Sequence, residues 1–167
     1  YSSTWVEPLK LNMFGYDGWT TPPSTQSYLT LSALKGYELL SQKYDDSLHM
    51  LIESYRIFAA DRDNITYDYG ANLHDFKGVD IDYIEEKIQL YNDESAGEFK
   101  FPEPKGGGTA YMTVKDSEGL GISLIQSNFH GIGSRIGVSN YGFFLHNRGC
   151  GFNLNQNHPN YIKAGRK

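Results

Sequence analysis

Residues 106–115 read Gly106-Gly107-Gly108-Thr109-Ala110-Tyr111-Met112-Thr113-Val114-Lys115, and the sequence changes character at this point. Prolines at positions 102 and 104 precede the glycines, so the segment from 101 to 108 can be neither helix nor interior strand. Apolar residues recur at helical spacing before this segment and at a period of two after it. The stretch therefore separates a helical part, residues 1–108, from a strand-rich part, residues 109–167.

Three helices are predicted in the first part. The first follows two prolines with Ser24 as its N-cap, and its apolar residues are Tyr28, Leu31, Leu34 and Leu39. Gly36 disfavours one unbroken helix there. The second is capped by Ser47 and has an apolar face formed by Leu48, Leu51, Ile52, Tyr55, Phe58 and Ala59. A shorter third helix begins near Asp80 and places Ile81, Ile84 and Ile88 on one side.

The second part is predicted to form antiparallel strands. Residues 109–115 and 120–127 make a hairpin, because a turn sequence at 116–119 separates them. Residues 142–146 are predicted as a third strand, and the glycines between 131 and 137 indicate a shaped loop. Helices followed by antiparallel strands predict an α+β layered fold.

The composition is that of a soluble globular protein, with 167 residues of which 39% are hydrophobic and 21% charged. A net charge of −5 gives no electrostatic footprint for nucleic acid. No apolar run is long enough to cross a bilayer, and no signal peptide is visible. We therefore expect a cytoplasmic protein with no nucleic-acid or membrane partner, no metal and no cofactor.

Thr109 is the candidate nucleophile. A threonine hydroxyl attacks poorly until a base removes its proton. A threonine that is the first residue of its chain carries that base itself, because its α-amine has a pKa of about 8. This arrangement needs a bare, flexible segment that can be cut and a strand that holds the hydroxyl, and residues 106–115 supply both. The plainer interpretation is a glycine linker that enters an ordinary strand.

Cys150 is an alternative nucleophile, with His146 or His158 as its base. It is the only cysteine, which excludes an internal disulfide. A single cysteine among glycine and phenylalanine is more often an inert packed thiol. We rank it below Thr109.

From about Leu11 onward, the chain resembles the γ-glutamyltranspeptidase family. The similar segments keep the family's order and spacing, and they are residues 20–25, 53–62, 108–110, 114–119 and 143–152. The resemblance implies a self-processing N-terminal-nucleophile hydrolase with an αββα sandwich, cut between Gly108 and Thr109. Residues 1–108 would then end the large subunit, and residues 109–167 would begin the small subunit.

The resemblance also implies roles for further residues. Ser127 is the second hydroxyl, which supports the nucleophile from the neighbouring strand. The family has an asparagine two positions beyond that hydroxyl, where this chain has Phe129, so Asn128 takes the substrate-binding role only if the strand shifts. Family members also bind the glutamyl α-ammonium with an acidic or amide residue and an aspartate, where this chain has Arg148 and Gly151.

Arg148 changes the expected substrate, because its charge repels an ammonium group and suits a carboxylate. The sequence is therefore more similar to a divergent branch of the family that includes oxamate amidohydrolase. We expect a self-processing amidohydrolase or acyltransferase that acts on a small anionic amide. A salt-bridged or surface Arg148 is the plainer interpretation.

The family's subunits extend beyond both ends of this sequence, so we expect this chain to be inactive alone. It would work with the remaining segments of both subunits, as a heterodimer of self-cleaved subunits or a higher oligomer. The alternative from another class is a noncatalytic homologue that serves as a binding or structural subunit.

Overall fold

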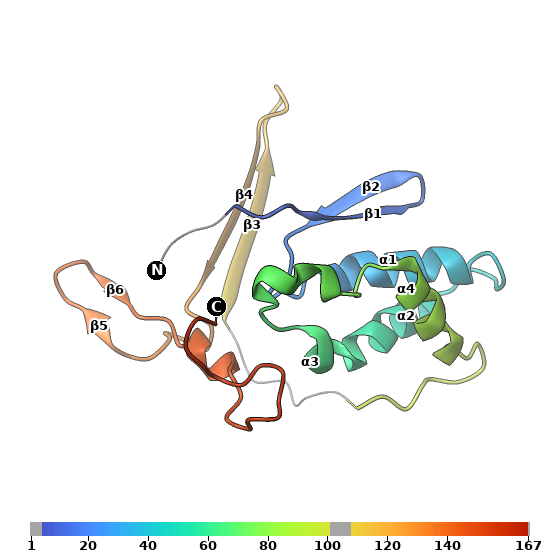
Figure 1. Cartoon of the computed structure of the whole chain (residues 1–167). Helices are drawn as coiled ribbons and strands as arrows, with labels where there is room; N and C mark the ends of the chain where they lie inside the picture. Colours follow the sequence, from blue (N-terminus) through green and yellow to red (C-terminus); the bar gives the residue numbers. More distant parts are fainter. Residues whose placement is uncertain (1–4, 101–107, 167) are drawn as a thin grey trace. The chain divides into compact units, whose positions relative to one another are not determined.

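The computed structural model describes residues 5–100 and 108–166, and these form a mixture of helices and small antiparallel sheets (Figure 1). The predicted α+β class is therefore confirmed. The chain divides into two compact units, Tyr1–Phe101 with Asn155–Lys167, and Pro102–Leu154. Gly106, Gly107 and the rest of the predicted 101–107 linker lie outside the described residues. The predicted subunit boundary at Gly108–Thr109 stays a prediction.

The first unit opens with a β-hairpin that the sequence analysis missed. Strands β1 (Leu9–Met13) and β2 (Tyr16–Thr20) pair antiparallel. They are joined by Phe14 and Gly15, whose φ angles of 52° and 79° are the left-handed values that a tight two-residue hairpin turn requires. The detectable signal was the apolar alternation of Leu9, Leu11 and Met13 before a glycine.

Helix α1 spans Tyr28–Leu40, so the predicted start at Ser24 is wrong. The chain turns at that point instead, because the Thr25 hydroxyl lies 3.1 Å from the carbonyl oxygens of both Thr21 and Pro22. Helix α2 spans Leu48–Ala60, and its predicted cap is confirmed, since the Ser47 side chain accepts a hydrogen bond from the Met50 amide. A cap is a local feature, which is why the sequence identified it.

The apolar face predicted for α2 is not its buried face, since four of the six predicted residues are exposed. Leu48, Leu51, Ile52 and Tyr55 are exposed, whereas Met50, Glu53, Ser54 and Ile57 are buried with Phe58 and Ala59. The buried polar groups are satisfied. The Glu53 carboxylate pairs with Arg56 and accepts a 2.8 Å hydrogen bond from the Gly97 amide, and the Ser54 hydroxyl donates to the Ala33 carbonyl. These long-range partners let polar residues replace apolar ones on the inner face.

Helix α1 runs unbroken through Gly36, which permits the close approach of α2. A Cβ atom at this position would lie 2.8 Å from the Ser54 hydroxyl oxygen and 2.9 Å from the Phe58 ring. The prediction that Gly36 disfavours an unbroken helix is therefore wrong. The missing side chain makes room for helix packing and does not break the helix.

The helices that follow α2 in the first unit are short: α3 (Arg62–Ile65), the 3-10 helix η1 (Gly70–Asp75), α4 (Ile81–Lys87) and the 3-10 helix η2 (Ile88–Leu90). The predicted third helix is confirmed, with Ile84 and Ile88 buried, but Ile81 is 40% exposed. Asp61 joins α2 to α4. Burial alone would raise its pKa, but hydrogen bonds from Asn64, Lys87 and Tyr83 hold the pKa below its ordinary value.

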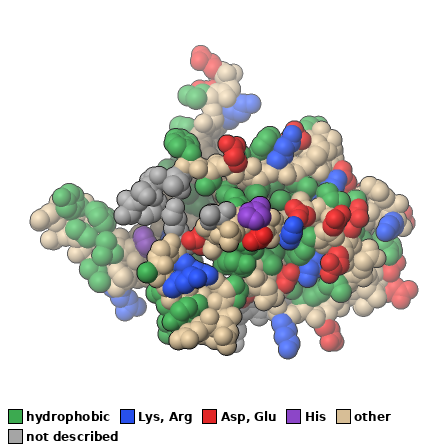
Figure 2. All heavy atoms as spheres, in the orientation of Figure 1, with side chains coloured by type: hydrophobic (Ala, Val, Ile, Leu, Met, Phe, Trp, Pro, Cys, Tyr) green, Lys and Arg blue, Asp and Glu red, His purple; other side chains and the backbone are tan. Residues whose placement is uncertain are grey.

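The second unit contains the predicted hairpin. Strands β3 (Thr109–Lys115) and β4 (Gly121–Ser127) pair antiparallel. The predicted third strand is shorter than expected: only Phe143–Phe144 (β6) is extended, and it pairs with β5 (Gly137–Val138). A 3-10 turn, η3, covers Arg148–Gly151. Figure 2 shows hydrophobic side chains gathered on the β5–β6 segment, where Phe143 and Phe144 are 52% and 45% exposed.

Within residues 5–100 and 108–166, no helix has both the length and the apolar character needed to cross a membrane.

Replacing Gly36 with alanine tests the α1–α2 contact. Helix propensity alone would make Gly36→Ala stabilising by about 1 kcal/mol. The crowding at Ser54 and Phe58 reverses the sign, so we expect the free energy of unfolding to fall by about 1–3 kcal/mol in urea titrations of the full-length protein. Thr30→Ala, at an exposed position of α1, is the matched control and should be neutral or slightly stabilising. A Gly36→Ala variant as stable as the control would contradict the packing.

Candidate active site

The register of the β3–β4 hairpin separates two kinds of surface. Residues that pair across an antiparallel ladder point to the same side. One face carries Thr109, Tyr111, Thr113, Ser123, Ile125 and Ser127, and the other carries Ala110, Met112, Val114, Ile122, Leu124 and Gln126. On the first face the Tyr111 and Ser123 hydroxyl oxygens lie 3.1 Å apart. The hairpin therefore has a hydroxyl-rich face and an almost wholly apolar one.

The hydroxyl-rich face ends at the two predicted site residues. Thr109 pairs directly with Ser127, and its hydroxyl donates a 2.9 Å hydrogen bond to the Ser127 hydroxyl oxygen. The Phe129 amide donates to the same oxygen at 3.0 Å. Ser127 therefore accepts two hydrogen bonds, one of them from the candidate nucleophile. The structure brings Thr109 and Ser127 together, and their catalytic roles stay predictions.

The residue before Thr109 is also fixed at the end of β4. The Gly108 amide donates to the Phe129 carbonyl oxygen at 3.2 Å. No atom would lie within 4 Å of a side chain at Gly108, so the backbone on that side of the junction is open. An open, exposed peptide next to a hydroxyl group is sterically suited to attack.

The loop that carries Arg148 is attached to the end of β4 through Asn147, which the sequence analysis did not single out. The Asn147 side-chain oxygen accepts a 3.0 Å hydrogen bond from the His130 amide. The Asn147 amide donates to the Asn128 carbonyl oxygen at 3.2 Å. This contact involves only the backbone of Asn128. The substrate-binding role of the Asn128 side chain stays a prediction. No pattern in the sequence marks Asn147, because both bonds are long-range.

Arg148 lies beside the backbone of Ser127. Its guanidinium donates a long 3.5 Å hydrogen bond to the Ser127 carbonyl oxygen and lies 5.6 Å from the centre of the Phe129 ring. The side chain is exposed, so it can meet a ligand. A side chain at Gly151 would enter open space. The two positions that the resemblance matches to the family's ammonium-binding pair are thus sterically accessible, and that match stays a prediction.

Cys150 contacts a different histidine from the two that the sequence analysis considered as its base. Its sulfur lies 4.0 Å from Nδ1 of His130, a residue not proposed as its base, and the cysteine is exposed rather than packed. In the described part of the chain, no three His, Cys, Asp or Glu side chains come together as a metal site.

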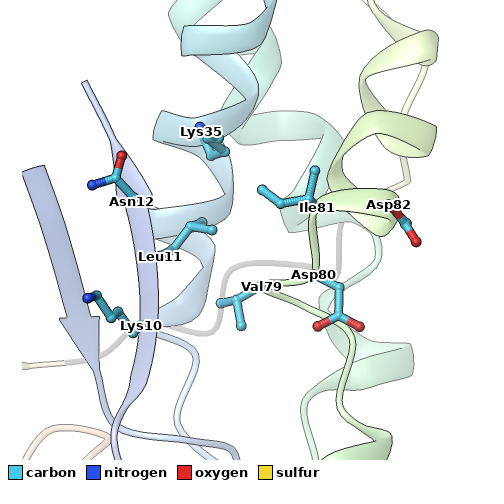
Figure 3. A pocket seen from close by; sticks show the side chains of 8 residues that line it. All are labelled: Lys10, Leu11, Asn12, Lys35, Val79, Asp80, Ile81 and Asp82. Carbon is cyan, nitrogen blue, oxygen red and sulfur yellow. The ribbon is translucent and has the colours of Figure 1, made fainter. Parts of the chain in front are cut away.

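A separate cavity of about 580 Å³ lies in the first unit (Figure 3). Lys10, Leu11 and Asn12 line it from β1, Lys35 lines it from α1, and residues 79–82 line it at the start of α4. Both lysines are already paired, Lys10 with Asp17 at 2.7 Å and Lys35 with Glu38. Both cationic groups that line the cavity are therefore already paired with a carboxylate.

An α+β chain whose hairpin begins with paired hydroxyl groups is compatible with the hydrolase class that the motifs imply. Residues 1–167 match the family model described as gamma-glutamyltranspeptidase, and the chain belongs to that family. The family predicted from the motifs is confirmed.

Two curated relatives fit the divergent branch that the motifs indicated. The chain is 27% identical over 172 residues to the glutathione hydrolase-like YwrD proenzyme of Bacillus subtilis strain 168, covering 98% of this chain and 32% of the relative. It is 28% identical over 159 residues to the oxamate amidohydrolase proenzyme of Klebsiella pneumoniae, covering 89% of this chain and 29% of the relative. The chain spans about a third of the length of these relatives.

Asn147 provides a test of the loop attachment. Asn147→Leu removes the acceptor of the His130 amide, so we expect hydrogen exchange at that amide to become about tenfold faster. Asn147→Asp keeps an acceptor oxygen and is the matched control, with exchange close to that of the wild type. Equal protection in the leucine variant would show that Asn147 does not hold the loop.

Proposed function

We propose that this chain carries the processing site and the nucleophile of a self-cleaving amidohydrolase of the γ-glutamyltranspeptidase type. The observation that supports it most directly is the 2.9 Å hydrogen bond between the Thr109 and Ser127 hydroxyl groups, directly after Gly108. The fold of the complete protein would be the αββα sandwich, with β3 and β4 in one of its sheets. The apolar face of the hairpin suits this arrangement, because such a sandwich buries sheet faces against neighbouring layers.

Cleavage would begin with attack of the Thr109 hydroxyl oxygen on the Gly108 carbonyl carbon. Ser127 accepts the hydrogen bond of that hydroxyl, so it is placed to relay the proton: its oxygen takes the Thr109 proton as the new C–O bond forms, and its own hydroxyl proton passes to the amide nitrogen of Thr109. The Gly108–Thr109 C–N bond then breaks, and the relayed proton stays on the nitrogen, which leaves an ester at the Thr109 oxygen and a free amine. Water hydrolyses the ester, and the products are a Gly108 carboxylate and a free α-amine on Thr109.

The freed threonine would then act on the substrate. Its α-amine, with an ordinary pKa of about 8, serves as the base for its own hydroxyl. The hydroxyl oxygen attacks the substrate amide carbon, the amine leaves with a proton, and an acyl-enzyme forms. Water or an acceptor amine releases the acyl group. Segments of both subunits outside this chain would complete the site, which accords with the length of the relatives.

Arg148 would select the substrate by charge. Its guanidinium lies next to Ser127 and is exposed, so an anionic group on a bound amide could pair with it. The same position would repel the α-ammonium of a glutamyl group. Asn128 remains a candidate for a second polar contact. We therefore propose a small amide that carries a carboxylate and no α-ammonium.

Removal of the Thr109 hydroxyl tests the processing step. Full-length wild type should separate into two fragments under denaturing conditions, the smaller beginning at Thr109, whereas Thr109→Ala should remain one chain. Thr109→Ser keeps a hydroxyl and is the matched control, which should still be cut. Ser127→Ala should slow cleavage about tenfold or more, because the hydroxyl that relays the proton is lost. A wild type that never separates would favour the noncatalytic alternative.

A charge reversal tests the substrate assignment. Wild type should turn over an amide with a carboxylate faster than a γ-glutamyl anilide, judged by kcat/KM. Arg148→Glu with Gly151→Asp should shift the preference toward the anilide by about ten- to a hundredfold, since one charged hydrogen bond is worth about 1.5–3 kcal/mol. Gly149→Asp, also at an open position, controls for added negative charge. Efficient wild-type turnover of the anilide would contradict the assignment.

A further inference from the structure

Phe129 has a backbone conformation that is rare for its residue type. Its φ angle is 79°, in the left-handed region, which bulky residues seldom occupy. Phe14 shares this feature because it lies in a tight hairpin turn, but Phe129 lies directly after β4, two residues beyond Ser127. An unfavourable conformation persists only where its surroundings impose it, so its contacts need an explanation.

Both backbone polar groups of Phe129 form hydrogen bonds with residues that flank Thr109 in the predicted site, namely Ser127 and Gly108. Its amide donates to the Ser127 hydroxyl oxygen at 3.0 Å, and its carbonyl oxygen accepts from the Gly108 amide at 3.2 Å. Thr109 lies between these two fixed points, since it follows Gly108 in the chain and donates to Ser127. A change in the Phe129 backbone would therefore move both the peptide to be cut and the hydroxyl that receives the nucleophile's proton.

The ring of Phe129 has its own contacts. It lies 4.2 Å from the His130 ring, centre to centre, and 5.6 Å from the Arg148 guanidinium. A guanidinium within about 6 Å of an aromatic face is attracted to it. The ring therefore limits the positions that Arg148 can take beside Ser127.

We propose that Phe129 is a positioning residue of this site, with a separate task for each of its parts. The left-handed backbone sets the distance between Gly108 and Ser127 for self-cleavage, and the ring orients Arg148 for the substrate carboxylate. The inference rests on the proposed self-cleavage at Thr109, and it assigns a role at the position where the family's asparagine is missing.

A pair of variants that differ by one methyl group tests the backbone task. Phe129→Gly accepts the left-handed conformation without cost, whereas Phe129→Ala opposes it, and both lack the ring. In cell-free synthesis of the full-length protein, with fragments followed by mass over time, Phe129→Gly should be cleaved within about threefold of the wild-type rate. Phe129→Ala should be cleaved about fivefold or more slowly than Phe129→Gly, because alanine keeps the cost of the left-handed backbone and lacks the ring contacts that hold phenylalanine in it. Phe129→Asn also tolerates this conformation and should behave as Phe129→Gly does.

Equal rates for Phe129→Gly and Phe129→Ala, whether both fast or both slow, would overturn the backbone task. Thermal unfolding of the three variants identifies any that do not fold. If Phe129→Gly does not fold, the cleavage rates of Phe129→Asn and Phe129→Ala give the same comparison. An uncut wild type contradicts the proposed function itself and this inference with it. A normally cut wild type with equal variant rates contradicts this inference alone.

Turnover kinetics test the ring. Phe129→Gly should raise KM for an amide with a carboxylate about tenfold while kcat stays close to that of the wild type, because Arg148 loses its support before substrate binds. Phe129→Tyr keeps the ring and should restore the low KM. A KM unchanged by loss of the ring would show that Phe129 does not position Arg148.

Discussion

The hairpin turn between β3 and β4 is the constraint on which the candidate site depends. The Asp116 carboxylate accepts hydrogen bonds from the Glu118 and Leu120 amides, each at 2.9 Å, and so closes the turn. The turn sets the register, and the register pairs Thr109 with Ser127 at the far end. A slip by one residue would place every side chain of one strand on the opposite face. The two hydroxyl groups would then lie on opposite sides of the sheet, and apolar residues would face the site.

The same register explains why one hairpin can serve chemistry and packing together. The hydroxyl-rich face ends at the candidate site, whereas Met112, Val114, Ile122 and Leu124 share the other face and are each about half exposed. Isolated two-stranded ribbons are marginal in water. The apolar side of the hairpin therefore has the composition of a sheet face within a larger layered fold, as the proposed sandwich requires.

Features determined by neighbouring residues could be predicted from the sequence, and features determined by distant partners could not. The Ser47 cap and the β3–β4 hairpin depend on a few adjacent residues. The buried face of α2 depends on Gly97 and Ala33, far away in the chain, which bind Glu53 and Ser54. Within the site, Thr109 and Ser127 were matched from the family resemblance and the predicted hairpin, and the structure supplied the register that pairs them. The attachment through Asn147 and the left-handed backbone of Phe129 left no mark in the sequence, since neither has a local pattern.

Two departures from the family pattern become one feature in the structure. By the resemblance to the family, position 129 has phenylalanine in place of asparagine, and position 148 has arginine in place of an acidic or amide residue. Asparagine is among the residues that adopt the left-handed conformation most readily, so the backbone at 129 suits the family's residue better than phenylalanine. Phenylalanine brings instead an aromatic face for the Arg148 guanidinium, 5.6 Å away. A positive charge held in place by an aromatic ring is more effective in recognising a carboxylate than one free to move, because less side-chain entropy is lost when the ligand binds. If the proposed substrate is correct, the unfavourable backbone at one position and the reversed charge at the other belong together, as parts of one change in what the proposed site recognises.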